Sequence, residues 1–307
     1  MDTGSHKAVL AAMLANAGIA AAKFVGFGFT GATSMLAEAV HSVADTGNQL
    51  LLLWGSAAAR RDANATHAFG HGRERYFWSF VVALIIFSLG GMFAIYEGVQ
   101  RVLHPHAVIQ VWWAIGILGV SVILEAFSFR TAIGEARHEK GTATWRSFVR
   151  DTKNPELPVV LMEDLGALVG LLLALSGVGL TALTGDARWD AIGSIAIGLL
   201  LVTIGVGLSV KMKALLIGES ATVQDEAAIR LAIEGSPEVR RLIHMRTQHI
   251  GPEEILLGAK LEFDGSYTLA ELARAIDAVE ARIRAQVPAT RFIFLEPDFF
   301  RAAPAAD

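Results

Sequence analysis

Six long apolar stretches dominate the N-terminal part of the chain. They cover roughly residues 7–29, 33–59, 74–101, 107–135, 156–183 and 187–212. A helix of about 20 apolar residues crosses the hydrocarbon core of a bilayer, and each stretch reaches that length. Turn-forming residues such as Gly31 and Gly185 separate neighbouring stretches. The pattern therefore predicts six transmembrane helices.

A different pattern follows residue 213. Apolar residues alternate with polar or small ones across 254–263, which predicts a half-buried strand. An apolar stripe with helical spacing follows the capping sequence Thr268-Leu-Ala-Glu271. With a helix before Gly235 and strands at 239–249 and 291–296, the predicted order is α-β-β-α-β. We therefore expect an all-α membrane domain over residues 1–213 and a small α+β domain over residues 214–307.

Basic residues indicate how the helices are oriented. Lys and Arg concentrate in the 59–75 and 130–153 connections and just after the sixth stretch, whereas the opposite side carries only Arg101 and Arg188. Connections rich in Lys and Arg stay in the cytoplasm. Both termini are therefore expected in the cytoplasm. The first residues show neither a signal peptide nor an Arg-rich transit segment, which favours a bacterial inner (plasma) membrane.

Composition narrows the function classes. Only 18% of residues are charged, the mean hydropathy is +0.47 and the net charge is −4. These values argue against a nucleic-acid binder, which needs a basic surface. The chain has no cysteine, which excludes disulfides, thiolate catalysis and iron–sulfur clusters. A bound metal must then take His, Asp, Glu or backbone oxygen ligands.

Ionisable residues within the apolar stretches are the strongest functional candidates, because such residues are costly at membrane depth. His41 and Asp45 lie four residues apart in the second stretch and share one helical face. Glu163 and Asp164 lie in the fifth stretch. Together they supply the nitrogen and oxygen ligands of a tetrahedral site for a divalent ion. The alternative is a neutral hydrogen-bonded network that packs the two helices.

Other polar residues carry weaker indications. His67 and His71 lie four residues apart in a cytoplasmic connection near Asp62, which is compatible with a metal site. The alternative for this connection is a solvated loop whose His71 caps the next helix. Lys23 and Asp190 lie toward the outer ends of their stretches, so we expect them to reach the interface.

The residues together resemble the cation diffusion facilitator family of divalent-metal/proton exchangers. The resemblance rests on six helices, a C-terminal domain, the His41-xxx-Asp45 pair, Asp164 and the loop His67-Ala-Phe-Gly-His71-Gly-Arg-Glu. The string from Asn154 to Asp164 resembles the branch that includes the mitochondrial zinc transporter of animals. The resemblance implies homodimers with a ferredoxin-like C-terminal domain.

One departure from the family bears on the ligands. Many members carry His four residues before the Asp of the fifth helix, whereas this chain has Val160. Glu163 precedes Asp164 directly, but successive side chains point about 100° apart on an ideal helix. Both therefore bind one ion only if the helix unwinds or rotates, and water is the other fourth ligand.

The resemblance implies export of divalent cations, with zinc favoured, in exchange for protons. The expected partners are the metal ion, protons, the lipid bilayer and a second copy of the chain, with no nucleic acid and no resident cofactor. Two alternatives come from other classes. An intramembrane metal-dependent hydrolase would carry a His-Glu-x-x-His string, which is absent. A membrane-anchored metal sensor would place its ligands in the C-terminal domain, where only His244 and His249 remain.

Overall fold

The computed structural model describes residues 3–106, 108 and 110–301. Internal contacts divide the chain into two compact units. The first comprises residues 1–58 and 74–213, and the second comprises residues 59–73 and 214–307. The connection 59–73 thus groups with the C-terminal part of the chain, although it joins two helices of the first unit.

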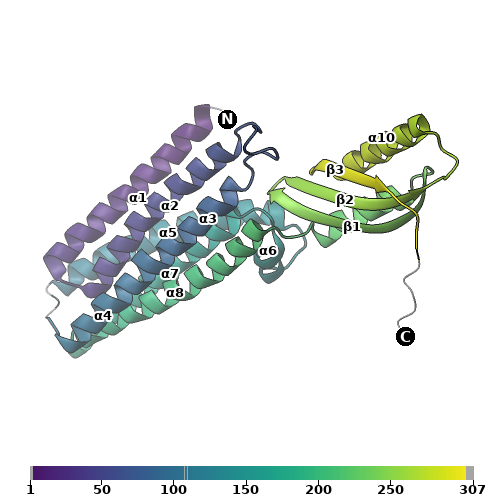
Figure 1. Cartoon of the computed structure of the whole chain (residues 1–307). Helices are drawn as coiled ribbons and strands as arrows, with labels where there is room; N and C mark the ends of the chain where they lie inside the picture. The colour runs from purple at the N-terminus through teal and green to yellow at the C-terminus, as the bar shows by residue number, and fades with distance from the viewer. Residues whose placement is uncertain (1–2, 107, 109, 302–307) are drawn as a thin grey trace, which may run out of the picture. The chain divides into compact units, whose positions relative to one another are not determined.

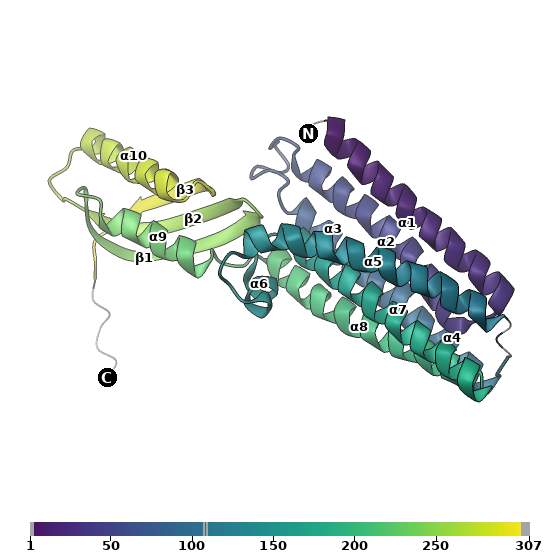
Figure 2. The same ribbon diagram turned by 180° about the vertical axis from the view of Figure 1, so that it is seen from behind.

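The first unit is a bundle of long helices that lie side by side (Figures 1 and 2). Its helices are α1 (Thr3–Thr30), α2 (Thr33–Ala59), α3 (Glu74–Ile85), α4 (Phe93–Leu103), α5 (Val111–Lys140), α6 (Trp145–Asp151), α7 (Glu156–Thr184) and α8 (Arg188–Ile217). A π-helical segment, η1 (Ile86–Met92), joins α3 to α4 in one continuous run. The short helix α6 falls within the 130–153 connection and was not predicted.

Four of these runs are long and apolar enough to cross a membrane among the described residues: Glu74–Leu103, Val111–Lys140, Glu156–Thr184 and Arg188–Ile217. The described part of α1 contributes a shorter apolar helix, Ala17–Thr30. Helix α2 has 27 residues but holds Glu38, His41 and Asp45. Each of the six predicted stretches thus coincides with a helix, and four of the described helices are long and apolar enough to cross a membrane.

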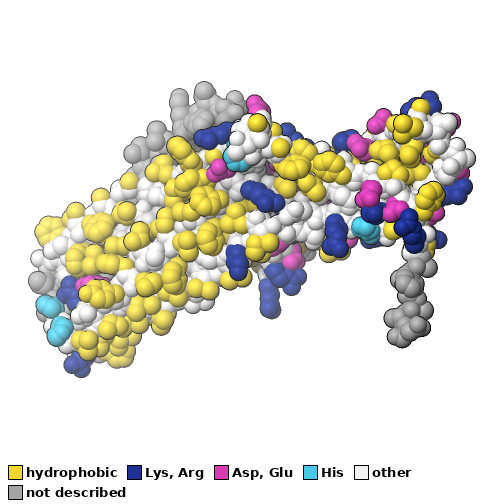
Figure 3. Space-filling model, viewed as in Figure 1, with side chains coloured by type: hydrophobic (Ala, Val, Ile, Leu, Met, Phe, Trp, Pro, Cys, Tyr) yellow, Lys and Arg dark blue, Asp and Glu magenta, His cyan; other side chains and the backbone are white. Residues whose placement is uncertain are grey.

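Apolar side chains also cover the outside of the helical unit. Phe29, Trp54, Trp112, Ile123 and Phe127 are all more than half exposed. Figure 3 shows such side chains spread along the helices on the face in view. Water does not tolerate so extensive an apolar surface, whereas lipid tails do. The chain is therefore a multi-pass membrane protein.

Glycines allow α8 to approach the run α3–η1–α4 at backbone distance. A Cβ atom at Gly198 would lie 2.7 Å from the carbonyl oxygen of Gly91 and 2.8 Å from the amide nitrogen of Ile95. A Cβ at Gly98 would lie 2.9 Å from the carbonyl oxygen of Ala191. Small residues are common where membrane helices pack without a hydrophobic driving force. These glycines therefore set how closely α8 packs against the run α3–η1–α4.

The second unit contains α9 (Val223–Glu234), β1 (Val239–Gly251), β2 (Glu254–Phe263), α10 (Leu269–Gln286) and β3 (Thr290–Pro297). The order α-β-β-α-β agrees with the sequence pattern. Alternate residues of β2, from Ile255 to Phe263, are buried in one core with Ile229 of α9 and Val279 of α10. Both helices therefore cover the same face of the sheet. Thr268 and Glu271 form the capping box at the start of α10.

The strand order departs from the expected ferredoxin-like arrangement. The sheet runs β1-β2-β3, with β1 and β2 antiparallel and β2 and β3 parallel. A ferredoxin-like sheet contains split βαβ units, in which another strand separates the two parallel ones. Here Leu257 of β2 pairs directly with Ile293 of β3. The described elements agree with that fold in their order, but their parallel strands are adjacent.

Candidate metal-binding site in the helical unit

His41 and Asp45 meet on α2 as their spacing predicts. His41 Nδ1 lies 3.3 Å from Asp45 Oδ1, one helical turn away. The imidazole is 1% exposed, and neither ring nitrogen makes a hydrogen bond with the described part of the chain. A buried imidazole without a hydrogen-bond partner keeps a lone pair for a proton or a metal ion. The pair therefore offers one nitrogen and one oxygen ligand to a metal ion.

A small polar cavity lies beside this pair. Eight residues from α1, α2, α5 and α7 line it: Ile19, Ser42, Asp45, Gln49, Glu125, Ser128, Glu163 and Asp164. Its volume is about 20 Å³, which is enough for one water molecule or one ion. Four carboxyl groups around so small a space repel one another unless protons or a cation neutralise them. The cavity is therefore suited to a cation.

Glu163 and Asp164 both line this cavity. The Glu163 carboxyl is buried and accepts a hydrogen bond from Asn48 Nδ2 of α2 at 3.2 Å. The Asp164 carboxyl accepts one from Ser128 Oγ of α5 at 3.3 Å. Helix α7 is continuous through both positions. Adjacent side chains reach one cavity because it lies between α2 and α5, so this geometry needs no unwinding of α7.

The structure brings some of the predicted residues together more closely than others. Asp45, Glu163 and Asp164 share the cavity, whereas His41 contacts Asp45 but does not line it. No group of three His, Asp or Glu side chains among the described residues is close enough to hold a metal as it stands. Glu125 of α5 is a further lining residue. A charged residue within an apolar stretch is the sequence feature by which Glu125 could have been found.

Val160 lies apart from the cavity. It packs against an apolar cluster formed by Ala132, Ala136, Phe148 and Leu161. Val160 is not among the residues that line the cavity. The position where many family members carry His is thus part of the packing between α7, α5 and α6. The carboxyl of Glu125 adds an acidic group to the cavity instead.

His67 and His71 are close together in the connection 59–73. Their ring centroids lie 4.5 Å apart, and Asn64 Oδ1 accepts hydrogen bonds from the backbone amides of Thr66 and His67. The ring nitrogen Nδ1 of His71 lies 3.4 Å from the carbonyl oxygen of Arg61. Helix α3 begins at Glu74, three residues after His71. The two rings are near enough to share an ion, but the described residues add no third ligand.

Lys23 and Asp190 do not reach the interface, so that prediction is wrong. Both are buried, with exposures of 2% and 1%. Lys23 forms an ion pair with Glu38. The Asp190 carboxylate accepts hydrogen bonds from the backbone amides of Thr33 and Ser34 at the start of α2. Each charge finds a partner inside the bundle, which removes the need to extend toward water.

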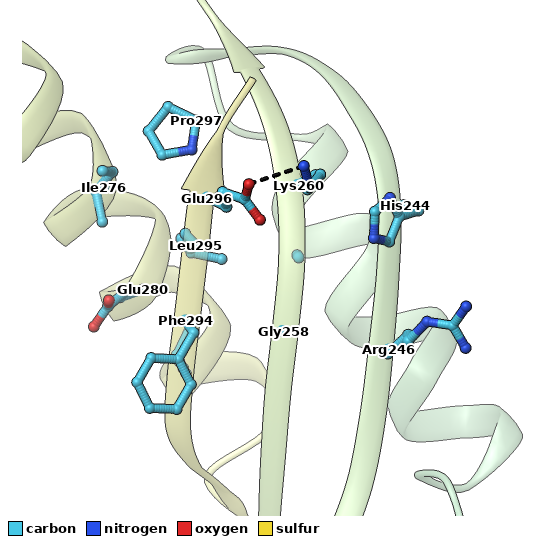
Figure 4. A pocket seen from close by; sticks show the side chains of 12 residues that line it. His244, Arg246, Gly258, Lys260, Ile276, Glu280, Phe294, Leu295, Glu296 and Pro297 are labelled. Atoms are coloured by element: carbon cyan, nitrogen blue, oxygen red, sulfur yellow. Dashed lines mark ion pairs between the residues drawn. The ribbon is translucent and has the colours of Figure 1, made fainter. Parts of the chain in front are cut away.

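A pocket in the C-terminal unit is lined by residues of all three strands and of α10 (Figure 4). His244 and Arg246 of β1, Lys260 of β2 and Glu296 of β3 are among its lining residues. Lys260 Nζ forms ion pairs with Glu296 at 2.8 Å and with Asp298 at 3.0 Å. The hydrogen bonds that Lys260 donates to these two carboxylates, the one to Glu296 first, raise the pKa of Lys260. The acidic groups are therefore already paired with a cation, which disfavours the sensor alternative.

Comparisons with known proteins show the family to which the chain belongs. The family model described as the cation efflux transmembrane domain matches residues 9–217. The chain is 32% identical over 267 residues to the proton-coupled zinc antiporter SLC30A9, mitochondrial, of Mus musculus, and this match covers 85% of the chain and 47% of the relative. It is 31% identical over 268 residues to metal tolerance protein C4 of Arabidopsis thaliana, covering 86% of the chain and 58% of the relative.

A bacterial relative matches over more of its own length. The chain is 25% identical over 268 residues to the cation-efflux pump FieF of Pectobacterium atrosepticum, covering 86% of the chain and 83% of the relative. In contrast, the chain spans about half the length of the antiporters with higher identity. The names of these relatives describe transporters and not enzymes. The family match and the identities show that the chain belongs to the cation efflux family, as the resemblance to cation diffusion facilitators implied.

Proposed function

We propose that the protein is a secondary transporter that exports divalent metal cations, preferably zinc, from the cytoplasm in exchange for protons. The carboxylate cavity next to His41 is the observation that carries the proposal, because its size and charge suit one cation. The name of the similar antiporter supports both zinc as the cation and the exchange for protons, and that of the efflux pump supports the export of a cation. The same proposal includes six spans, cytoplasmic termini and a homodimer in a bacterial inner membrane.

Competition between metal and protons for the same groups explains the exchange. Metal binding requires a neutral imidazole at His41 and ionised carboxylates at Asp45, Glu163 and Asp164, so binding releases protons. When the cavity faces the cytoplasm, zinc displaces protons from these groups. When it faces the other side, protons displace zinc.

Zinc uptake into proteoliposomes under a pH gradient tests the proposal. The purified wild-type chain is expected to accumulate zinc only when the gradient is present. His41→Ala and Asp45→Ala should each abolish uptake while the protein still purifies as a folded species. His138→Ala is a suitable control, because His138 is exposed near the end of α5. Uptake at wild-type rate by Asp45→Ala would exclude the cavity as the transport site, and the same result for His41→Ala would exclude the imidazole from it.

A further inference from the structure

Lys23 is a buried cation that the exchange mechanism does not use. It lies in α1, and its side chain is 2% exposed. Its Nζ atom lies 3.1 Å from Glu38 Oε2 and donates a hydrogen bond to Ser42 Oγ at 2.8 Å. Glu38 and Ser42 are one turn apart on α2. The ammonium group therefore links α1 to α2 through two contacts inside the bundle.

Glu38 lies where three helices meet. Its side chain is fully buried, and its Oε1 atom has no hydrogen-bond partner among the described residues. A Cβ atom at Gly170 of α7 would lie 2.6 Å from this oxygen, so α7 passes directly over it. An ionised carboxylate in this position depends on its cation, because an unpaired buried charge is strongly unfavourable. Lys23 and Glu38 thus act as one pair.

The positive end of this pair points toward the cavity. Ser42, which accepts the hydrogen bond from Lys23, is itself a lining residue of the cavity. A fixed ammonium beside carboxylates competes with any other cation that they attract. Only the Ser42 side chain lies between the Lys23 ammonium group and the cavity.

Packing alone does not require such a pair. A buried ion pair is often replaceable by apolar residues without loss of stability. At membrane depth an ionisable residue is also expensive to retain. A purely structural link between α1 and α2 could be made by apolar contacts. The position of the pair beside the cavity therefore points to an electrostatic role.

We propose that Lys23 is a positioning residue that holds a fixed positive charge beside the cavity. This charge lowers the affinity of the cavity for a divalent cation. This inference rests on the proposed export. A transporter must release its ion as well as bind it, and a nearby fixed cation limits how tightly the carboxylates hold zinc. Glu38 keeps the ammonium charged and oriented toward Ser42. Neutralising the pair should then give tighter binding with slower release.

Equilibrium zinc binding to the purified full-length protein tests the inference. Lys23→Met combined with Glu38→Gln removes both charges without leaving one unpaired. This variant should bind zinc about three- to tenfold more tightly, as expected for loss of a cation at this range. Lys23→Arg keeps the charge and should retain wild-type affinity. On an Asp45→Ala background the same double change should have no effect, because the cavity no longer binds zinc.

Matched variants separate this role from packing. Arg101 and Glu97 form an ion pair of similar length within α4, with 3.0 Å between the charged atoms. Neutralising that pair by Arg101→Met with Glu97→Gln should leave zinc affinity unchanged. If the neutral pair at Lys23 does not fold, Lys23→Glu with Glu38→Lys retains an ion pair and reverses its direction. That variant should also bind zinc more tightly, since a carboxylate then faces Ser42.

Two results would overturn the inference. One is wild-type zinc affinity in the neutral or the reversed pair, and the other is an equal shift in Lys23→Arg. Uptake by the wild-type chain is measured in parallel. If the wild type binds zinc but does not transport it, the proposed export fails, while the affinity comparison still decides whether Lys23 acts on the cavity.

Discussion

At the scale of single residues, the cavity depends on which neighbour each carboxyl group meets. Glu163 receives a hydrogen bond from Asn48 of α2, and Asp164 receives one from Ser128 of α5. These two neighbours aim adjacent side chains of α7 at a common space. A single carboxyl in such a place would be most stable when protonated, but several together attract a cation.

Removing the charge of Glu163 should therefore weaken metal binding. Glu163→Gln keeps an oxygen that can accept from Asn48, and we expect its zinc affinity to fall at least about tenfold, as for groups next to or within a metal shell. Competition with a zinc-binding dye measures the affinity. Glu135→Gln, at an exposed position of α5, is the control. Unchanged affinity in Glu163→Gln would mean that Glu163 only packs α7 against α2.

Asp264, between β2 and α10, gives the C-terminal unit a defined pH dependence. The hydroxyl and amide of Ser266 and the guanidinium of Arg240 donate to its carboxylate, and they lower the pKa of Asp264 to about 2, with the Ser266 hydroxyl first. An unfolded Asp has a pKa of about 3.9. The stabilisation is thus complete above about pH 4 and is lost as the pH falls toward 2.

Denaturant unfolding of the full chain, followed in the C-terminal unit by hydrogen exchange, measures this effect. Wild-type protection should decrease between about pH 4 and pH 2, and Asp264→Asn should flatten that decrease. Asp277→Asn, at an exposed position of α10, should keep the wild-type slope. Equal slopes in wild type and Asp264→Asn would contradict the assignment.

At the scale of elements, the run from Glu74 to Leu103 combines an irregular segment with close packing. Its centre is η1, a π-helix of seven residues. Segments of this kind are rare and are often found at functional sites. A Cβ atom at Gly90 would lie 3.8 Å from His41 Nδ1, so the π-helix presents bare backbone to the imidazole. The tight contact of Gly91 with α8 follows directly after it.

The glycine contacts between α8 and this run predict a selective loss of stability. Gly198→Ala should destabilise the protein by about 1–3 kcal/mol, because the added methyl group meets backbone atoms that cannot move aside. Gly207→Ala, also in α8, meets nothing within 4 Å. It should be neutral or slightly stabilising, since Ala favours helix. Thermal unfolding in detergent distinguishes the two, and equal midpoints would show that α8 packs differently.

At the scale of the whole molecule, a helical unit with an apolar exterior is joined to a small sheet unit with its own core. The basic connections indicate which side of the membrane carries the sheet unit. The core of that unit, centred on Ile255, Leu257 and Val279, is independent of the bundle.

Single cysteines can measure the orientation directly, because the chain contains none. His106→Cys lies at an exposed position of the connection before α5, and Ser147→Cys lies at a partly exposed position of α6. In intact bacterial cells, a membrane-impermeant maleimide should label His106→Cys and should label Ser147→Cys only after permeabilisation. The reverse pattern would place the termini outside the cytoplasm.

The sequence alone determined the elements, because their signals are local. Apolar length predicted the helices of the bundle, and alternation predicted β2. The shared face of His41 and Asp45 also follows from helical spacing, and the 3.3 Å contact agrees with it. The acidic residues stood out because they interrupt apolar stretches. Each of these inferences uses residues a few positions apart, for which backbone geometry fixes the distance.

Only the tertiary structure decided the partners across helices. Lys23 pairs with Glu38, and Asp190 binds the start of α2 from a position 157 residues after Thr33. Glu125 and Glu163 meet at the cavity from α5 and α7. No periodicity encodes such meetings, because they depend on how helices pack and rotate against one another. The same reason applies to the sheet, where direct pairing of β2 with β3 was set by the fold and not by either strand's pattern.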